Sequence, residues 1–524
     1  MVNAKKLLRD RGICVVIPTY NNAGTIADVV RRTLAQCQDV IVVCDGCTDV
    51  TLDVLHGVEG ITIVAYDKNA GKGTALKRGF RKAVEMGFAY AITLDADGQH
   101  FPEDIPCLLR ANQQHPGALI VGQRKELDKA ERSGGSKFAN AFSNFWFAVQ
   151  TWHYLPDTQS GYRLYPLKNS QFTIHNSQSN ISFISFISFV SSFLHFFNFS
   201  FFLSRYEAEV ALLVFSAWRG VKIVSVPVNV WYPSPEERVS HFRPIRDFSR
   251  IFVLNTVLCV LAVIYGLPLA IWRGLMTFLR TTYALLFFLL TTIFIAKPLA
   301  MLYRIIYRDI EERRMAIHRL LWRYARFVTL RHGIPGVRFS CANPHGEDFH
   351  EPAIIICNHQ SSLDLITMLI HTPKLVVLTK DWVWNNPLYG SIIRGAEFYP
   401  VSEGMETLLP KLRSLIDRGY SIVVYPEGTR ALDYTIGRFH QGAFHLAQQF
   451  GVDILPIVSY GTGRVLPKGA KFILGWPVRI EIDRRISPEE MHSFGETPRA
   501  QASAMRRYYE DRYLTISNRI EQEF

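Results

Sequence analysis

The sequence predicts two α/β domains separated by a helical membrane hairpin. Short β-branched runs alternate with helical patterns over residues 1–250, and the same alternation resumes after about residue 333. Such alternation is typical of parallel α/β sheets. Two apolar runs lie between these regions, and 524 residues are enough for two ordinary domains plus a membrane segment. We therefore expect domains at 1–250 and 333–524, a membrane pair at 251–303 and a linker at 304–332.

The membrane hairpin is predicted from charge and length. Residues 251–272 contain no Asp, Glu, Lys or Arg, and a second apolar run leads from Thr281 toward Tyr303. The first run would form a helix about 33 Å long, enough to cross a hydrocarbon core of about 30 Å. Pro268 predicts a kink or an early end. A buried helical pair of a soluble domain is the alternative, but such helices are usually shorter.

Basic residues on both sides of the hairpin predict its orientation. Arginines precede residue 251 and follow residue 303, and positive flanks stay in the cytoplasm. Both domains are therefore expected on the cytoplasmic face of the cell (inner) membrane. A full hairpin would carry Arg273 and Arg280 across the bilayer, whereas a shallow hairpin in one leaflet would not.

The net charge of +12 is compatible with nucleic acid or with anionic lipid as a partner. No nucleic-acid motif is present, and residues 304–332 hold eight arginines against three acids, with apolar residues at helical spacing. This pattern predicts a basic amphipathic helix on the bilayer, although a surface helix of the following domain would look similar. We expect a membrane partner and no nucleic acid.

Only Cys44 and Cys47 among the cysteines have redox or metal spacing, and no second pair completes a zinc site. The spacing is expected to be incidental and the chain reduced. The N-terminus lacks an apolar segment, so no cleaved signal peptide is expected.

In the N-terminal domain, polar clusters follow each predicted strand. The strands are residues 13–17, 40–43, 61–65 and 91–94, and residues 26–36 are predicted to be a helix. Parallel sheets bind ligands beyond the carboxyl ends of their strands. A binding site is therefore predicted along that edge of the sheet.

The residue types at this edge indicate a nucleotide diphosphate. Asp95, Asp97 and Gln99 offer hard oxygen ligands for Mg²⁺ or Mn²⁺, which can neutralise a diphosphate leaving group. Lys72 and Arg124 are predicted to clamp phosphate oxygens. The glycines around Lys72 do not have P-loop spacing, so a P-loop is excluded.

Four ordered motifs resemble the inverting family-2 glycosyltransferases of GT-A fold, in particular the subgroup of dolichyl-phosphate-mannose synthase. They lie at residues 16–21, 45–49, 69–73 and 95–97. The resemblance implies a nucleotide-sugar substrate, with Asp45 near the nucleoside, the metal on Asp95, Asp97 and Gln99, and Arg124 facing the diphosphate. One departure is Cys44, which stands where the family usually has an Asp.

Residues 157–163 resemble the acceptor-side motif of the same family. Asp157 is the candidate general base for an acceptor hydroxyl, and Arg163 is expected to bind substrate. Asp157 could instead cap a turn, and a lipid phosphate acceptor would need no base. The Phe/Ser-rich residues 177–204 are expected to be an insertion that is disordered or lies on the bilayer.

The C-terminal domain contains a His–Asp pair after a predicted strand. His359 and Asp364 follow the strand at 353–357, and a second strand is predicted at 422–425. Imidazole can take a hydroxyl proton while Asp364 fixes its tautomer. No Gly-x-Ser-x-Gly elbow is present, so direct attack of a bound hydroxyl on a thioester is favoured over an acyl-enzyme.

The pair, together with residues 425–430, resembles the lysophosphatidic-acid acyltransferase (PlsC-type) family. The resemblance implies that His359 is the base and Asp364 its partner, and that Glu427, Gly428 and Arg430 shape the acceptor site. The block at 396–402 lacks the family's arginine, so the acceptor is expected to differ from lysophosphatidic acid.

The predicted function is therefore bifunctional. One half transfers sugar from a nucleotide sugar to a lipid-borne acceptor, and the other transfers an acyl group from acyl-CoA or an acyl carrier protein to a hydroxyl. The domain order resembles hybrids associated with aryl-polyene and flexirubin-type pigments. The alternative is that only the acyltransferase half is active and the glycosyltransferase half is a binding or scaffolding module.

Overall fold

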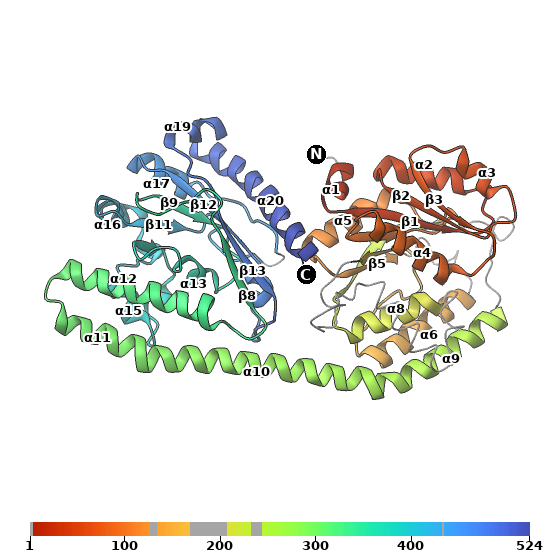
Figure 1. Ribbon diagram of the computed structural model, residues 1–524, viewed down its shortest axis with the longest axis horizontal. Coiled ribbons are helices and arrows are strands. Elements are labelled where there is room, and N and C mark those ends of the chain that lie inside the picture. The colour runs from red at the N-terminus through yellow and green to blue at the C-terminus, as the bar shows by residue number, and fades with distance from the viewer. Residues whose placement is uncertain (1–3, 126–133, 168–206, 232–243, 432–433, 524) are drawn as a thin grey trace. The chain divides into compact units, whose positions relative to one another are not determined.

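The computed structural model describes residues 4–125, 134–167, 207–231, 244–431 and 434–523 (Figure 1). These fall into two compact units, Met1–Arg273 with Glu521–Phe524, and Gly274–Ile520. The insertion expected at 177–204 lies outside the described residues.

The first unit is built on a seven-stranded sheet of order β3-β2-β1-β4-β6-β5-β7. β6 runs antiparallel to β4 and β5, and the other pairs are parallel. The four predicted strands are confirmed as β1 to β4. The bounds are β1 Ile13–Thr19, β2 Val40–Asp45, β3 Ile61–Tyr66, β4 Tyr90–Thr93, β5 Leu119–Arg124, β6 Arg163–Pro166 and β7 Ile223–Val228.

Alternate residues of the central strands enter two separate cores, one on each face of this sheet. Val16 and Val43 pack in one core, whereas Val15 and Val42 pack in the other. Side chains alternate across a strand, so a strand covered on both faces is apolar throughout. The covering helices are α1 Ala4–Asp10, α2 Ile26–Gln36, α3 Thr51–His56, α4 Lys72–Glu85, α5 Ile105–Gln114, α6 Gly134–Thr151, α8 Glu207–Trp218 and α9 Pro244–Leu261.

The second unit has a six-stranded sheet of order β10-β11-β9-β12-β13-β8. β12 and β13 are antiparallel, and the other pairs are parallel. The strands predicted at 353–357 and 422–425 are confirmed as β9 and β11. The bounds are β8 Arg338–Ala342, β9 Ile354–Cys357, β10 Leu375–Val377, β11 Ser421–Val424, β12 Ile454–Tyr460 and β13 Pro477–Ile482.

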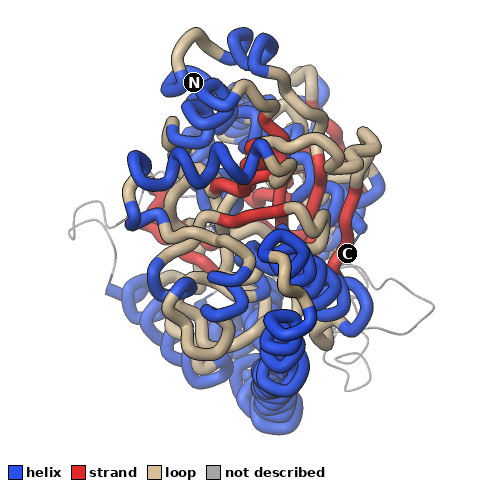
Figure 2. The backbone as a smooth tube through the Cα atoms, turned by 90° about the vertical axis from the view of Figure 1, so that its left-hand side faces the viewer, coloured by secondary structure: helices blue, strands red, loops and turns tan. Residues whose placement is uncertain are grey.

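Helices flank this second sheet on both sides (Figures 1 and 2). The longest of them, α20, ends the described chain. The helices are α12 Ile310–Arg326, α13 Asp364–Met368, α14 Asp381–Trp384, α15 Gly390–Gly395, α16 Met405–Asp417, α17 Gly442–Phe450, α18 Thr462–Val465, α19 Pro488–Met491 and α20 Pro498–Glu523.

The apolar segment forms one long helix. Ser249–Ile306 is helical over 58 residues and is long and apolar enough to cross a membrane. It comprises α9, a π-helical turn at Ala262–Gly266, α10 Leu267–Thr291, a second π-helical turn at Thr292–Ala296 and α11 Lys297–Ile306. Pro268 and Pro298 each stand two residues after a π-helical turn, which adjusts the helix to the missing proline N–H.

The hairpin turn expected between Arg273 and Arg280 is wrong, because α10 continues through these residues as helix. Both arginines contact protein. A Cβ on Gly220 would lie 2.4 Å from the Arg273 guanidinium, and Arg280 donates a hydrogen bond of 2.5 Å to the carbonyl of Pro335. Arginine is a good helix former, so charge alone did not mark a turn.

α12 packs as a helix of the second unit. Its N-cap Asp309 accepts a hydrogen bond from the N–H of Glu312 (2.9 Å), Trp322 donates to the carbonyl of Ile370 (3.0 Å), and Arg314 pairs with Glu397 (3.1 Å). Of the two interpretations of residues 304–332, the domain-surface helix fits these contacts.

Candidate active sites

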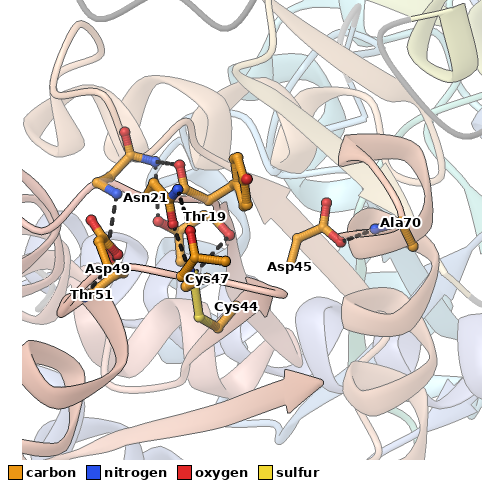
Figure 3. The surroundings of a disulfide bond; sticks show 11 residues. Thr19, Asn21, Cys44, Asp45, Cys47, Asp49, Thr51 and Ala70 are labelled. Carbon is orange, nitrogen blue, oxygen red and sulfur yellow. Dashed lines mark hydrogen bonds between the residues drawn. A yellow bond between two sulfur atoms is a disulfide. The ribbon is translucent and has the colours of Figure 1, made fainter. Parts of the chain in front are cut away.

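Asp45 ends β2 and fixes the loop that leads into α4. Its carboxylate accepts hydrogen bonds from the N–H groups of Ala70 (2.7 Å) and Gly71 (2.8 Å), as Figure 3 shows for Ala70. Gly46 has φ +64°, and a Cβ there would lie 2.3 Å from the Asn69 nitrogen, so glycine is required. Asp45, expected beside the nucleoside, holds in the structure the loop that precedes Lys72.

Cys44 and Cys47 form a disulfide next to Asp45 (Figure 3). The expectation of an incidental spacing and reduced cysteines is wrong for this pair. The N–H of Gly46 donates to the carbonyl of Cys44 (3.0 Å), and this tight turn brings residue 47 back beside the end of β2. The other six cysteines are free.

Lys72, the first residue of α4, lies between two carboxylates. Its Nζ is 2.6 Å from Oδ1 of Asp95 and 3.1 Å from Oε2 of Glu209. His100 Nδ1 lies 3.9 Å from the other oxygen of Asp95. Burial would raise the pKa of Asp95, but the charges of Lys72 and His100 outweigh it, so the pKa is lowered. Asp95 is therefore anionic at neutral pH.

Asp97 stands two residues further and accepts a hydrogen bond from the N–H of Gln99 (3.0 Å). Burial and the charge of Asp95 raise the pKa of Asp97. The residues that the structure describes contain no group of three or more His, Cys, Asp or Glu side chains that could hold a metal. The donor set is nevertheless two neighbouring carboxylates and an amide, and a divalent cation would relieve the repulsion between the carboxylates, so these residues fit Mg²⁺ or Mn²⁺.

Arg124 and Asp157 contact each other directly. Nε and Nη2 of Arg124 donate to the two oxygens of Asp157 at 2.7 and 2.8 Å, and the Arg124 N–H adds a bond of 3.2 Å. Gln159 N–H also donates to Asp157 (3.3 Å). A carboxylate held by this many donors is a weak base. The arrangement favours Asp157 as the residue that orients Arg124 rather than as a base.

Arg163, expected to bind substrate, has no exposed surface. It donates to the carbonyls of Ser160 (2.7 Å), Thr158 (2.8 Å) and Glu209 (2.8 Å). These bonds tie the loop before β6 to the first turn of α8. The placement favours a supporting role in the site.

In the second unit, His359 follows β9 and Asp364 begins α13. His359 Nδ1 lies 2.9 Å from Asp364 Oδ2, and the same oxygen accepts hydrogen bonds from the N–H groups of Gln360 (2.7 Å) and Ser361 (2.8 Å). Asp364 is fully buried, whereas the His359 side chain is 20% exposed. Three donors on one oxygen fix the carboxylate. Because Nδ1 faces Asp364, it carries the proton, which leaves Nε2 as the proton acceptor.

Glu427 holds the backbone around His359 and does not face an acceptor. Its two oxygens accept the N–H groups of His359 (2.8 Å) and Gly437 (2.8 Å). Burial raises the pKa of Glu427 to about 7. The ring of Tyr425 stacks on the imidazole, with the centroids 4.3 Å apart. Sequence reasoning missed this stack, although Tyr425 is the first residue of the motif at 425–430.

Arg430 and Gly428 lie on the loop that follows β11. Arg430 Nη1 donates to Ser362 Oγ (2.8 Å), and Lys468 Nζ donates to the carbonyl of Arg430 (3.1 Å). Gly428 has φ +66° with His440 close by, so a larger residue is disfavoured there. The structure thus places two cations near the His359 loop, of which Lys468 gave no signal in sequence.

Glu209 was also missed. It lies two residues after Glu207, at the start of a predominantly apolar helix, and no spacing rule distinguishes it from an ordinary acidic N-terminus. Only the fold brings it to Lys72.

Comparisons with known proteins match the two units to different families. A family model described as Glycosyl transferase family 2 matches residues 14–167, and one described as Acyltransferase matches residues 341–460. The chloroplastic 1-acyl-sn-glycerol-3-phosphate acyltransferase LPAT1 of Arabidopsis thaliana is 32% identical over 127 residues, 24% of this chain and 36% of that protein. The chain thus spans about a third of that relative's length.

Two further proteins are similar to parts of the chain. A UDP-N-acetylglucosamine–dolichyl-phosphate N-acetylglucosaminyltransferase of Methanococcus voltae is 28% identical, covering 30% of this chain and 70% of that protein. The solved acyltransferase PlsC from Thermotoga maritima is 20% identical with a TM-score of 0.40, covering 48% of this chain and 99% of that chain. By the two family matches, the chain carries a family 2 glycosyltransferase domain and an acyltransferase domain.

Proposed function

We propose that the chain is a bifunctional membrane enzyme that glycosylates a lipid-borne acceptor and acylates a hydroxyl. The observation that carries the acyl half is the geometry of His359 and Asp364. His359 Nε2 accepts the proton of the acceptor hydroxyl, the oxygen attacks the thioester carbonyl of acyl-CoA or an acyl carrier protein, and the thiolate leaves and takes up the proton. Asp364 stabilises the imidazolium in between.

For the sugar half, we propose a nucleotide sugar as donor. The acceptor oxygen displaces the nucleoside diphosphate from the anomeric carbon. Asp95, Asp97 and Gln99 would hold Mg²⁺ or Mn²⁺, which when bound supplies positive charge to the diphosphate. Lys72 and Arg124 add donors for the same phosphates.

The contact between Asp157 and Arg124 supports a lipid phosphate as acceptor. A phosphate is already ionised and needs no general base, whereas a hydroxyl would need a base that Asp157, saturated by donors, supplies poorly. The archaeal relative is named for a dolichyl-phosphate acceptor, which agrees with this choice.

Membrane attachment is proposed through Ser249–Ile306. Because this segment is one continuous helix, both domains lie on the same face only if the helix lies along the membrane surface and does not cross it. The arginines on both flanks support such a placement on the cytoplasmic face, where nucleotide sugars and acyl thioesters are found.

The test is to assay purified chain for both reactions. Radiolabelled UDP-sugar with a polyprenyl phosphate, and acyl-CoA with a lysophospholipid, should each give a labelled lipid. His359→Ala should lose only the acyl product and Asp97→Asn only the sugar product. The alternative, an inactive glycosyltransferase half, is motivated by Cys44 and its disulfide beside Asp45. It predicts acyl product alone with every sugar donor and lipid phosphate tried.

A further inference from the structure

Lys72 is shared between Asp95 and a carboxylate on a distant part of the chain. Glu209 lies in the first turn of α8 and is 5% exposed. One oxygen is 3.1 Å from Lys72 Nζ, and the other is buried without a hydrogen-bond partner among the described residues. An incompletely paired buried carboxylate is costly, so the arrangement calls for a reason beyond packing.

The surroundings hold Glu209 in this place. The buried Arg163 donates to the Glu209 carbonyl (2.8 Å), which fixes the start of α8. On the other side, a Cβ on Gly161 would lie 2.6 Å from Asp95 Oδ2 and 3.0 Å from Lys72 Nζ. The ammonium is therefore confined by the Gly161 backbone and by two carboxylates.

We propose that Glu209 is a positioning residue for Lys72, and that the division of Lys72 between Asp95 and Glu209 sets how strongly Asp95 and Asp97 bind a divalent cation. The inference rests on the proposed function of the glycosyltransferase domain. An ammonium 2.6 Å from Asp95 repels a second cation at that carboxylate. Glu209 draws the ammonium from Asp95 and keeps it at the edge of the site, within reach of a diphosphate.

A purely structural role is the competing explanation. In that case the pair between Lys72 and Glu209 only ties α4 to α8, and removing either partner lowers stability without a systematic effect on metal binding. Our proposal predicts opposite effects of the two substitutions on metal affinity, because Lys72 opposes binding of the cation and Glu209 assists it. The structural explanation predicts no such opposition.

The experiment titrates the full-length chain in detergent with Mn²⁺ alone and measures free Mn²⁺ by electron paramagnetic resonance. We expect Lys72→Gln to bind Mn²⁺ on the order of tenfold more tightly, because a competing charge is gone. Glu209→Gln should bind on the order of tenfold more weakly, since Glu209 then no longer attracts the ammonium away from Asp95. The double variant should resemble Lys72→Gln, because Glu209 acts through Lys72.

Glu207→Gln is the matched control. Glu207 is a buried carboxylate on the same turn of α8, but it pairs with Arg250 (3.0 Å), so its loss should leave Mn²⁺ affinity unchanged. Lys72→Gln carries the test even if Glu209→Gln does not fold, because misfolding cannot tighten binding.

Three outcomes overturn the inference. One is a Lys72→Gln variant that binds no more tightly than wild type, and another is a double variant as weak as Glu209→Gln. The third is a wild-type chain that binds no Mn²⁺, which also overturns the metal in the proposed function. The first two leave that function intact.

Discussion

A single oxygen of Asp364 accepts all the hydrogen bonds that reach this carboxylate among the described residues. Oδ2 accepts from His359 Nδ1 and from the N–H groups of Gln360 and Ser361, whereas Oδ1 is buried and has no partner in the part of the chain that the structure describes. An asparagine could therefore place its carbonyl oxygen at the Oδ2 position and keep all three donors. Its amide nitrogen would occupy the Oδ1 position. Asp364→Asn is thus expected to preserve the tautomer of His359 and to remove only the charge.

The expected loss follows from this geometry. A hydrogen bond to a charged group contributes about 1.5–3 kcal/mol against about 0.5–1.5 kcal/mol for a neutral one. The difference of roughly 1–1.5 kcal/mol lowers the acyl-transfer rate about tenfold. Asp364→Ala leaves the three donors without an acceptor and should lose about 10²-fold or more. His359→Ala removes the base and should lose about 10²–10⁴-fold.

The assay is the initial rate of acyl transfer from a thioester to a lysophospholipid, followed by thiol release, for the wild type and the three variants. The expected order of rates is wild type, Asp364→Asn, Asp364→Ala and His359→Ala. A wrong tautomer costs on the order of 10⁴-fold. If Asp364→Asn falls as low as His359→Ala, the amide nitrogen faces the imidazole and the reasoning from Oδ2 is refuted. Equal rates in all four proteins would show that the domain only binds its ligand.

Three other predictions concern single side chains. Burial raises the pKa of Glu427 to about 7, so protonation of Glu427 stabilises the folded chain by about 3 kcal/mol below about pH 4.5, and this stabilisation is lost as the pH rises through 7. In denaturant unfolding, the free energy of unfolding of Glu427→Gln should not show this fall with pH. Gly161→Ala places a Cβ 2.6 Å from Asp95 Oδ2 and should lower the sugar-transfer rate at least tenfold, which corresponds to an activation free energy higher by about 1.4 kcal/mol or more. An unchanged rate would contradict this packing. Asp97→Asn should abolish sugar transfer while acyl transfer stays within a few-fold, and sugar transfer that resists EDTA would exclude the metal.

The strands that carry the sites could be predicted from sequence because their signals are local. Residues 13–17 and 353–357 are buried on both faces, so they form short apolar runs in the sequence, which end at Pro18 and Asn358. The helix at 26–36 also has a local pattern, because its buried residues Ile26, Val29, Val30 and Thr33 recur at helical spacing. β5, β6 and β7 were not predicted. β6, for example, has four residues and is inserted antiparallel between strands from other parts of the chain. Pairing at such separations leaves no local pattern.

The long helix shows the limit of charge patterns. Arg273 and Arg280 suggested a turn because an arginine in an apolar run is costly in lipid. In the structure, they lie against Gly220 and Pro335, where neighbouring protein accepts them. The sequence contains the arginines but not the surfaces that they meet.

The acidic residues of both sites divide into two groups that sequence could not separate. Asp45, Asp157 and Glu427 were expected to contact substrate, yet their oxygens accept backbone N–H groups of the loops around them. Asp95 and Asp97 accept few such bonds. A motif identifies which acids are present, but only the number of donors around each shows whether it has lone pairs left for a ligand.

This division explains why substitutions in either group would impair activity for different reasons. A loop-holding carboxylate such as Glu427 fixes a backbone, so its loss shifts His359 as a whole, and a displacement of about 1 Å costs on the order of 10²-fold. A ligand-facing carboxylate such as Asp97 leaves the backbone in place and removes one charge. Substituting a loop-holding carboxylate should therefore lower the rate of every reaction at its site, including slow hydrolysis of the thioester by water. Substituting a ligand-facing carboxylate should leave unchanged the rate of any reaction that develops no charge near that residue.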